Sequence, residues 1–505
     1  MPLHAEEQQA TKPAQAHFDV REYRVQDNTL LQKRDIERTL YPLLGINKTA
    51  QDVEAARQAL SHAYSKAGYG TVLVVIPPQD VANGIVYLQV IEGRVEHTYV
   101  TGAQYFSPSR IRDKLPALAE NNVLYLPSLQ TQLAAINGVS QDRVVTPVLR
   151  PGRTPGTVDV ELKVRDHLPL HGSLALNNRY TLNTTHQRLE ASLSYDNLWQ
   201  REHSLSLQYQ TSPENTSEVQ VSAATYVWRP GDGNSVMALY GVHSDSDVAT
   251  VGAMSVIGKG DIVGLRFIQP VSDGGQRITL GADYKDFKDS ILQGADSFVT
   301  PINYLQFSAQ YSGRWQAESI TDASVSANWG LRGIVNDQGK FAAKRYNAEA
   351  NYFYVKAELE HQRSLWKAAR LRADIKGQWS ESPLISNEQF GAGGVESVRG
   401  YVESERLGDT AVQINLELHT ASWITSGKRG VQDLHGMLFV DAAQLNVKDA
   451  LPRQESHYDI SGAGLGVHAQ AWGGEMLMDV AWPFASAVDT RSGDPRVHFS
   501  VGYRF

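Results

Sequence analysis

The strongest constraint on the fold is a strict alternation of apolar and polar residues that starts near residue 170 and continues to the C-terminus. One face of the segment 187–197 carries Leu189, Ala191, Leu193 and Tyr195. Charged residues and serines occupy the positions between them, and the segment 203–213 alternates in the same way. A period of two places successive side chains on opposite faces of a β-strand, so this part of the chain is predicted to be all β.

Alternation alone fits two architectures: a soluble sandwich with one wet face, or a membrane barrel with an apolar face toward lipid and a polar lumen. The segments run to about 10–13 residues, which suits tilted spanning strands. Tyr, Trp and Phe recur at their ends, where aromatic girdles lie. The last segment places Val497, Phe499, Val501, Tyr503 and Phe505 on one face and ends on an aromatic residue. These features favour the membrane barrel.

Sixteen segments qualify as strands of this barrel. They are 172–181, 187–197, 203–213, 217–229, 234–244, 259–271, 276–290, 301–316, 318–332, 350–362, 369–382, 409–420, 434–445, 461–471, 473–484 and 495–505. An even number suits a closed antiparallel barrel with both ends on one side. About sixteen strands enclose an aqueous channel unless something fills it. We therefore predict a 16-stranded antiparallel transmembrane β-barrel over residues 170–505.

The chain before the barrel mixes helical and strand patterns in the order β-α-α-β-β, and it does so twice. The first copy consists of a strand at 18–26, helices at 30–43 and 50–67, and strands at 70–77 and 84–93. A fainter copy follows within 95–169, so two tandem α/β domains are predicted at 17–94 and 95–169. The alternative is a single α+β domain. The apolar helix face with Val53, Ala56 and Leu60 is expected to be domain core rather than a ligand groove.

Composition excludes several classes of protein. The 505 residues carry a net charge of −8, which argues against a general nucleic-acid binder. The absence of cysteine rules out thiolate metal sites, cysteine nucleophiles and disulfides. The sequence contains no nucleotide-binding G-x-x-x-x-G-K-[ST] loop, no G-x-S-x-G or H-E-x-x-H motif, and no metal-ligand spacing among its 15 histidines. No enzyme, cofactor or metal is therefore expected, and a passive porin would leave the first half unexplained.

A charged turn, GGVESVRGY at 393–401, lies in the longest gap between predicted strands late in the barrel, 383–408. Two strands further on, alternation in LFVDAAQL turns Phe439 and Asp441 toward the lumen and their neighbours Leu438 and Val440 toward lipid. A lumenal carboxylate and a loop arginine are natural partners. We therefore expect the loop to fold inward and Arg399 to pair with Asp441, with Tyr401 packing near Phe439.

Together these motifs resemble the Omp85 superfamily, and in it the TpsB family of two-partner secretion transporters (the ShlB/FhaC type). The resemblance implies that 17–94 and 95–169 are POTRA domains 1 and 2. It assigns Val398, Arg399, Gly400 and Tyr401 to the lumen-loop motif, Phe439 and Asp441 to the wall motif, and Tyr503 and Phe505 to the barrel-assembly signal. One departure is Ala443, where the wall motif usually has glycine.

The polar segment 1–16 has neither a basic start nor an apolar core, so no intact signal peptide is expected. Sixteen residues extend to roughly 50 Å. This is too short for the plug helix and linker that many members of the family place before POTRA 1.

The function implied by the resemblance is secretion of an unfolded TpsA-type exoprotein, such as a haemolysin, an adhesin or a toxin, through the bacterial outer membrane without ATP. The POTRA domains would lie in the periplasm. The expected partners are this exoprotein, outer-membrane lipids and the barrel-assembly machinery, with no nucleic acid, and the transporter is expected to be a monomer. The alternative is an outer-membrane protein insertase of the BamA or TamA kind, although those relatives usually carry three or more POTRA domains.

Overall fold

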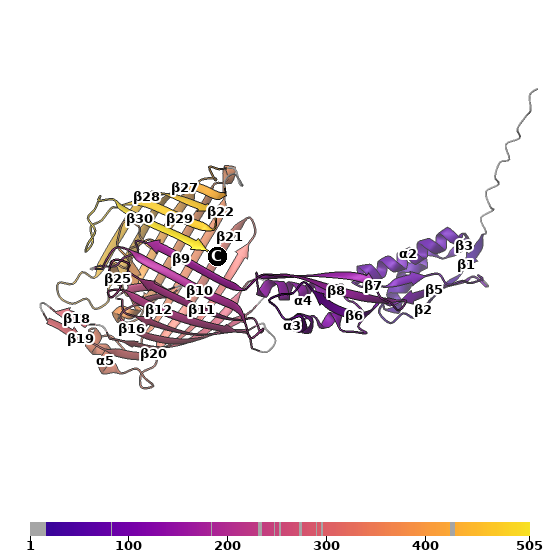
Figure 1. Ribbon diagram of the computed structural model, residues 1–505, viewed down its shortest axis with the longest axis horizontal. Helices are drawn as coiled ribbons and strands as arrows, with labels where there is room; N and C mark the ends of the chain where they lie inside the picture. Colours follow the sequence, from indigo (N-terminus) through magenta and orange to yellow (C-terminus); the bar gives the residue numbers. More distant parts are fainter. Residues whose placement is uncertain are drawn as a thin grey trace, which may run out of the picture. The chain divides into compact units, whose positions relative to one another are not determined.

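The structure is a computed structural model that describes residues 17–505 except 82, 183, 231–234, 247, 252–253, 272–274, 289, 294–295 and 425–429 (Figure 1). The polar segment 1–16 lies outside the described residues. The chain divides into two compact units, Met1–Pro169 and Leu170–Phe505. Among the described residues, no helix is both long and apolar enough to cross a membrane.

The first unit begins with a three-stranded mixed sheet covered by two helices. The sheet has the order β2 (Glu22–Gln26), β5 (Ile85–Ile91) and β4 (Leu73–Val75), with β2 parallel to β5. The helices are α1 (Lys33–Leu40), extended by η1 (Tyr41–Leu43), and α2 (Ala50–Lys66). The predicted strand 18–26 is interrupted, because β1 (Phe18–Val20) pairs instead with β3 (Gly45–Lys48), a short strand between the helices that the sequence did not indicate.

A second sheet repeats this topology. Its order is β6 (Arg94–Thr101), β8 (Thr157–Asp166) and β7 (Arg143–Pro151), with β6 parallel to β8. Its helical elements are α3 (Pro108–Asp113), η2 (Pro116–Leu118) and α4 (Leu126–Val139). Separate sets of buried apolar residues pack inside the two repeats. Val53, Ala56 and Leu60 are buried in the first repeat, as expected for core residues.

The second unit is a closed antiparallel barrel of sixteen strands, which confirms the predicted fold class. Its strands are β9 (Leu170–Asn177), β10 (Arg188–Leu198), β11 (His203–Thr211), β12 (Gln220–Trp228), β13 (Val236–Ser244), β16 (Gly260–Pro270), β17 (Arg277–Phe287), β20 (Ile302–Gln316), β21 (Ser319–Gly330), β22 (Phe353–Ser364), β23 (Arg370–Ser380), β26 (Thr410–His419), β27 (Val431–Asn446), β28 (His457–Ala471), β29 (Gly474–Pro483) and β30 (Arg496–Arg504). Each of them overlaps one of the predicted segments.

Shorter elements connect the barrel strands. They are the hairpins β14 (Val248–Val251) with β15 (Met254–Ile257) and β18 (Ser290–Gln293) with β19 (Asp296–Val299), the helix α5 (Gln338–Lys344), the turns η3 (Trp366–Ala368) and η4 (Ser386–Glu388), and the pair β24 (Phe390–Ala392) and β25 (Arg406–Gly408).

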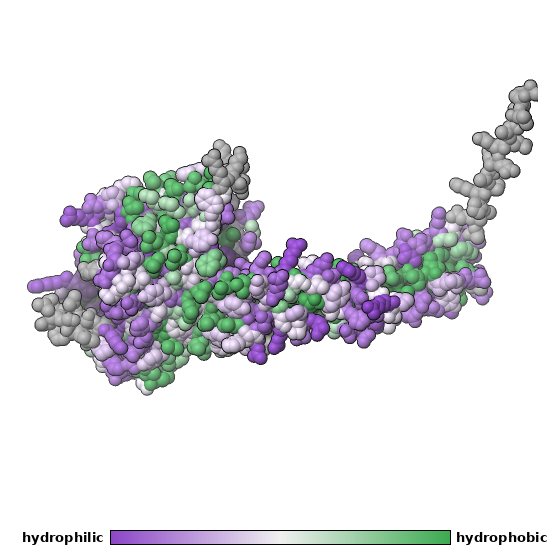
Figure 2. Space-filling view, in the orientation of Figure 1, coloured by the Kyte–Doolittle hydropathy of each residue, from purple (hydrophilic) through white to green (hydrophobic). Residues whose placement is uncertain are grey.

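The alternation places apolar side chains on the outside of the barrel, where Figure 2 shows hydrophobic residues over the strands. Leu438 and Val440 of β27 are 58% and 52% exposed, whereas Phe439 and Asp441 between them are buried inside. This is the arrangement that lipid outside and a polar lumen inside require.

The barrel closes between β30 and β9 over a short seam of five residue pairs, from Ser500–Asn177 to Arg504–Ser173. Beyond the paired strands, Gly172 and Phe505 exchange two backbone hydrogen bonds of 3.0 Å each. A Cβ at Gly172 would lie 2.3 Å from the Phe505 ring. Phe505 therefore takes part directly in closing the ring of strands.

Candidate functional site: a loop held inside the barrel

The segment between β23 and β26 folds into the lumen rather than away from the barrel. It contains the short antiparallel pair β24 and β25, and its tip carries the motif noted in the sequence. Val398, Arg399 and Tyr401 are all nearly inaccessible to solvent, with exposures between 0% and 3%. A charged turn at the end of a long loop reaches this burial only when the barrel wall surrounds it.

Arg399 is bound to Asp441 by three hydrogen bonds. Its Nε donates to Oδ2 at 2.7 Å, its Nη2 donates to Oδ1 at 2.8 Å, and its backbone N–H donates to Oδ2 at 3.1 Å. This is the two-point geometry in which a planar guanidinium matches a carboxylate. The expected contact between loop and wall is therefore present in the structure.

Two further carboxylates and an aromatic ring complete the surroundings of Arg399. Its Nη1 lies 2.9 Å from Oε1 of Glu417 and 3.8 Å from Oδ2 of Asp479. Its guanidinium carbon stands 3.6 Å from the centre of the Phe439 ring, in the position of a cation–π contact. The sequence indicated Phe439 and Asp441 but not the other two acids, which stand on β26 and β29.

Three glycines of β28 make room for this cluster. A Cβ at Gly462 would lie 2.6 Å from the carbonyl oxygen of Arg399, and one at Gly464 would lie 2.3 Å from the Phe439 ring. A Cβ at Gly466 would lie 2.0 Å from Oδ1 of Asp479. Sequence reasoning missed these residues, although alternate glycines in SGAGLGVH, on one face of a strand, are the signal of a close approach from inside the barrel.

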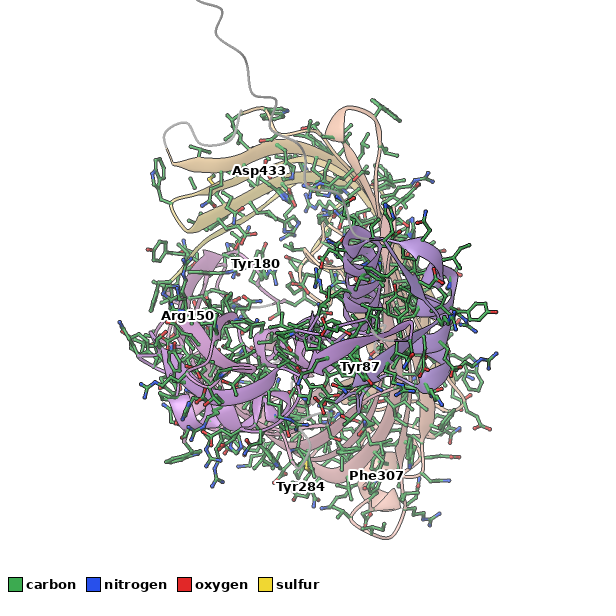
Figure 3. All side chains as sticks on the ribbon, turned by 90° about the vertical axis from the view of Figure 1, so that its right-hand side faces the viewer. Tyr87, Arg150, Tyr180, Tyr284, Phe307 and Asp433 are labelled. Atoms are coloured by element: carbon green, nitrogen blue, oxygen red, sulfur yellow. The ribbon has the colours of Figure 1, made fainter. Side chains whose placement is uncertain are left out.

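Gly400 turns the chain after the arginine. Its φ is +99°, and its N–H donates to Nε2 of His498 at 3.0 Å. Glycine adopts this left-handed conformation without the steric cost that a Cβ brings. The Gly400 carbonyl accepts a hydrogen bond of 3.3 Å from Nε of Arg496. The guanidinium of Arg496 lies over the ring of Tyr180, which is labelled in Figure 3.

Tyr401 is buried, but it does not join Phe439 as the sequence analysis expected. The turn at Gly400 separates the two rings, and Tyr401 packs in a cluster that includes Val398, Leu445 and Ala443. Its hydroxyl group donates to the carbonyl oxygen of Ala485 at 2.8 Å and also lies 3.1 Å from the carbonyl oxygen of Ser461. The methyl group of Ala443 is part of the packing around the loop tip.

Other buried acids fix the rest of the loop. Near its start, Glu388 accepts hydrogen bonds from Lys285 at 2.6 Å, Tyr304 at 2.5 Å and Tyr354 at 2.7 Å. At its end, Asp409 forms a two-point ion pair with Arg345, with distances of 2.5 and 2.7 Å. Sequence reasoning did not single out these residues, because isolated acids in strands and loops carry no local signal of burial.

The other predicted site residues lie at the seam, apart from the loop motif in the sequence and in their contacts. The rings of Tyr503 and Phe505 lie 6.4 Å apart and are stacked at 29°. Phe505 bonds to Gly172, and Tyr503 pairs with Leu174 across the seam. Their expected role as an assembly signal stays a prediction.

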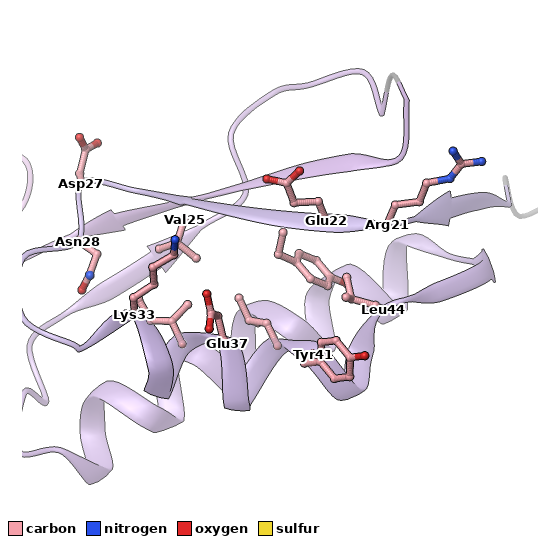
Figure 4. A pocket seen from close by; sticks show the side chains of 12 residues that line it. Arg21, Glu22, Val25, Asp27, Asn28, Lys33, Glu37, Tyr41 and Leu44 are labelled. Atoms are coloured by element: carbon pink, nitrogen blue, oxygen red, sulfur yellow. The ribbon is translucent and has the colours of Figure 1, made fainter.

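A groove in the first α/β repeat runs between the edge strand β2 and the helix α1 (Figure 4). It encloses about 570 Å³, and its lining includes Tyr23, Ile36, Leu40, Tyr41 and Leu44. The side chain of Tyr41 is 77% exposed. Arg24 donates to Glu22 at 2.8 Å on the same strand, which lowers the pKa of that carboxyl group. The groove therefore offers apolar side chains beside a strand that is paired on one side.

A closed sixteen-stranded barrel with an arginine-tipped loop in its lumen, preceded by α/β repeats, defines a class: a transmembrane β-barrel protein. The ShlB-type POTRA domain matches residues 18–93. The chain belongs to the family described as haemolysin secretion/activation protein ShlB/FhaC/HecB, which matches residues 156–469. This is a family of transporters and not of enzymes. It places the barrel in the bacterial outer membrane and the POTRA region in the periplasm.

Individual relatives agree with this assignment. The outer membrane transporter CdiB of Dickeya dadantii (strain 3937) is 24% identical over 436 residues, which are 80% of this chain and 73% of that protein. The structure of CdiB from Escherichia coli is 19% identical with a TM-score of 0.64, covering 100% of this chain and 94% of that one. BamA from Haemophilus ducreyi lacking POTRA domains 1–3 has a TM-score of 0.59 at 14% identity, covering 97% of this chain and 100% of that one, and shows the shared fold alone.

Proposed function

We propose that this transporter secretes a TpsA-type partner protein through its barrel in extended form, and that the inward loop must leave the wall for the partner to pass. The observation that carries the proposal is the binding of Arg399 to Asp441, Glu417 and Asp479. These contacts hold the loop in the path that an extended chain would take through the lumen.

The ion pairs of Arg399 are compatible with a loop that moves. Breaking a buried ion pair costs about 3–5 kcal/mol when one partner stays behind uncompensated. A passing polypeptide with polar groups of its own lowers that cost, because it offers new partners to the released arginine and to the wall acids. The loop is therefore firmly closed at rest and can be displaced when the lumen is occupied.

Capture of the partner begins, in this proposal, at the groove of the first repeat. Strand β2 is an edge of its sheet, so an extended segment can add to it as a further strand. Apolar side chains of that segment would then lie against Leu40 and Tyr41. Recognition through backbone hydrogen bonds suits a partner that arrives unfolded.

No nucleotide takes part in this scheme, and the sequence contains no phosphate-binding loop. Folding of the partner on the outer side of the membrane would prevent its return and give the movement a direction. The cargo for a test is the large secreted β-helical protein whose reading frame we expect beside this gene.

The proposal is tested by tying the loop to the wall. The chain has no cysteine, so Ser397→Cys together with Gln413→Cys supplies the only two thiols, at neighbouring positions of loop and wall whose native side chains are joined by a hydrogen bond of 2.8 Å. A short bifunctional thiosulfonate reagent, which bridges two thiols through disulfide bonds, should stop secretion and a reducing agent should restore it, while each single variant secretes under both conditions. Continued secretion by the cross-linked protein would show that the loop need not leave the wall.

A further inference from the structure

Three histidines from neighbouring strands meet at the inner wall of the barrel. His419 ends β26, His435 lies near the start of β27, and His468 lies near the end of β28. Their ring centres are 5.3 to 5.9 Å apart, and each ring offers one nitrogen within 4.8 Å of the other two. The search for ligand spacing along the sequence missed them, because antiparallel pairing brings together residues that are 16 and 33 positions apart.

A carboxylate stands behind each imidazole. Glu417 Oε2 lies 3.0 Å from Nε2 of His419, and Asp433 Oδ2 lies 2.9 Å from Nδ1 of His435. Asp433 is labelled in Figure 3. Such a carboxylate fixes the tautomer of a metal-binding histidine and strengthens the other ring nitrogen as a ligand. In this pair the other nitrogens, Nδ1 of His419 and Nε2 of His435, face each other at 3.2 Å.

That separation fits two ligands of one metal ion. Zinc–nitrogen bonds of about 2.0–2.1 Å in a tetrahedral site place two nitrogens about 3.3 Å apart. The third histidine, His468, has Asp479 beside it, and Oδ1 of this acid lies 3.6 Å from Nε2 of the ring. Within the described part of the chain, that nitrogen and both oxygens of the buried Asp479 have no hydrogen-bond partner. Buried polar atoms left without a bond are costly unless a ligand or solvent uses them.

We propose that His419, His435 and His468 form a site for a divalent transition-metal ion of the zinc class, facing the barrel lumen. Imidazole ligands suit zinc, copper and nickel, whereas magnesium and calcium prefer oxygen. Three histidines leave a fourth position open to water or to a group from the lumen. A cavity of about 420 Å³, lined by His419, His468, Glu417, Asp479 and Arg399, gives access to the site.

The metal site shares two acids with the loop contact. Glu417 lies between His419 and Arg399, at 3.0 and 2.9 Å, and Asp479 lies between His468 and Arg399, at 3.6 and 3.8 Å. A metal ion bound to the histidines attracts both acids by its positive charge. The site thereby connects metal binding to the strength with which the wall holds the loop.

The test is zinc binding to the purified full-length protein in detergent, prepared with a tag that contains no histidine. Zinc is titrated against a chromogenic indicator, and cobalt is bound separately to record the absorption of a tetrahedral site. We expect one zinc ion per chain, lost in the double variant His435→Asn with His468→Asn. Asp433→Asn should weaken binding about 10–100-fold, as expected for the loss of an acid behind a ligand.

The matched control is His361→Asn. His361 is a barrel histidine outside the cluster, and its ring is hydrogen-bonded to Thr321. This variant should bind zinc as the unaltered protein does. All variants are first compared by gel migration with and without heating, so that failure to fold is recognised. Equal zinc binding by the unaltered protein and the double variant, or loss of binding in His361→Asn, would overturn the assignment.

Discussion

Arg399 faces three acids, and this imbalance makes it the centre of the loop contact. Asp441 holds it in two-point geometry, while Glu417 and Asp479 add negative charge around the same guanidinium. The arginine is 3% exposed and Asp441 is fully buried, so water screens the pair little. Removing the cation leaves two buried acids and the partly buried Glu417 behind, which costs more than the loss of one surface ion pair of about 0–1 kcal/mol.

The first prediction concerns Arg399. Arg399→Ala should cut secretion strongly while the barrel stays assembled in the membrane, because the loop tip loses its position. Arg399→Lys keeps the charge but loses the planar fork and the stacking on Phe439, so it should secrete at an intermediate level. Secretion of the partner and heat-dependent gel migration of the barrel measure the two effects. Normal secretion by the alanine variant would contradict the role of the contact.

Exchanging the two charges would not isolate this pair. Arg399→Asp with Asp441→Arg keeps an ion pair between the two positions. It also brings a new carboxylate next to Glu417 and Asp479, so three negative charges meet. We therefore expect little rescue from the exchange. Asp441→Asn, which keeps the shape and removes one charge, is the more direct test of the wall partner.

The second prediction concerns Gly464. Gly464→Ala would place a Cβ 2.1 Å from the backbone oxygen of Val480 and 2.3 Å from the Phe439 ring. The backbone cannot yield cheaply, so the amount of assembled barrel should fall. Gly241→Ala is the matched control, because its Cβ would meet one backbone oxygen at 3.9 Å. Equal amounts of heat-modifiable protein for both variants would show that β28 adapts to the methyl group.

Among the single residues of the site, the sequence predicted those that belong to a motif. It missed those that reach the site only through the register of neighbouring strands. Alternation and the loop motif together indicated that Arg399 would meet Asp441. Glu417, Asp479 and the three histidines reach the same place only through the pairing of β26 to β29. The sequence of one strand does not determine which residue of the neighbouring strand lies opposite.

Among the elements, the groove beside β2 offers the plainest test of partner capture. Tyr41 lies on its rim and is 77% exposed, so Tyr41→Asp should leave the fold intact and lower secretion. Ile46→Asp is the control: this residue is 80% exposed on β3 and does not line the groove. The amount of secreted partner per assembled barrel is the measurement. Equal loss in both variants would point to a general effect of added charge.

The connection between β7 and β8 depends on one acid of β6. Glu96 accepts hydrogen bonds from the backbone N–H groups of Arg153 and Thr154 and from the hydroxyl groups of Thr154 and Thr157. The Thr157 hydroxyl contributes most to a pKa lowered to about 2. A carboxyl group with a lowered pKa stabilises the fold above its unfolded value of about 4.3, and this contribution fades as the pH falls toward 2.

The fourth prediction follows from this pKa. An NMR titration of residues 17–169 should show the Glu96 carboxyl group still ionised at pH 3, and Glu96→Gln should speed exchange of the Arg153 and Thr154 amides at neutral pH. A glutamate in a short model peptide, which titrates near 4.3, is the reference. A Glu96 pKa in that ordinary range would contradict the hydrogen bonds described.

Element boundaries show where sequence reasoning loses precision. Long alternating segments located all sixteen barrel strands, because one period extended over many residues. The strand Gly45–Lys48 was missed because four residues carry too little pattern, and its pairing with β1 is what interrupts the predicted strand 18–26. Short strands are set by their partners more than by their own residues.

On the scale of the whole molecule, the seam decides whether the barrel is closed. The fifth prediction is that Phe505→Asp lowers the amount of assembled barrel rather than the transport rate of the barrels that form. The new carboxylate would replace the ring that packs against Gly172, on the exposed outer surface of the barrel. Heat-modifiable protein in the outer membrane, with secretion normalised to it, separates the two effects. Arg504→Asp, a charge change at the neighbouring position, is the control.

The position of the seam also has a kinetic consequence. Gly172 and Phe505 are 333 residues apart in the sequence, so joining them costs about 5 kcal/mol of loop-closure entropy if the chain between them is unstructured. Hairpins must therefore form first, and the ring can close only after β30 is in place beside β9. Until then β9 and β30 are free edges that can pair with another copy. Refolding in detergent should accordingly give a higher yield of monomer the more dilute the protein.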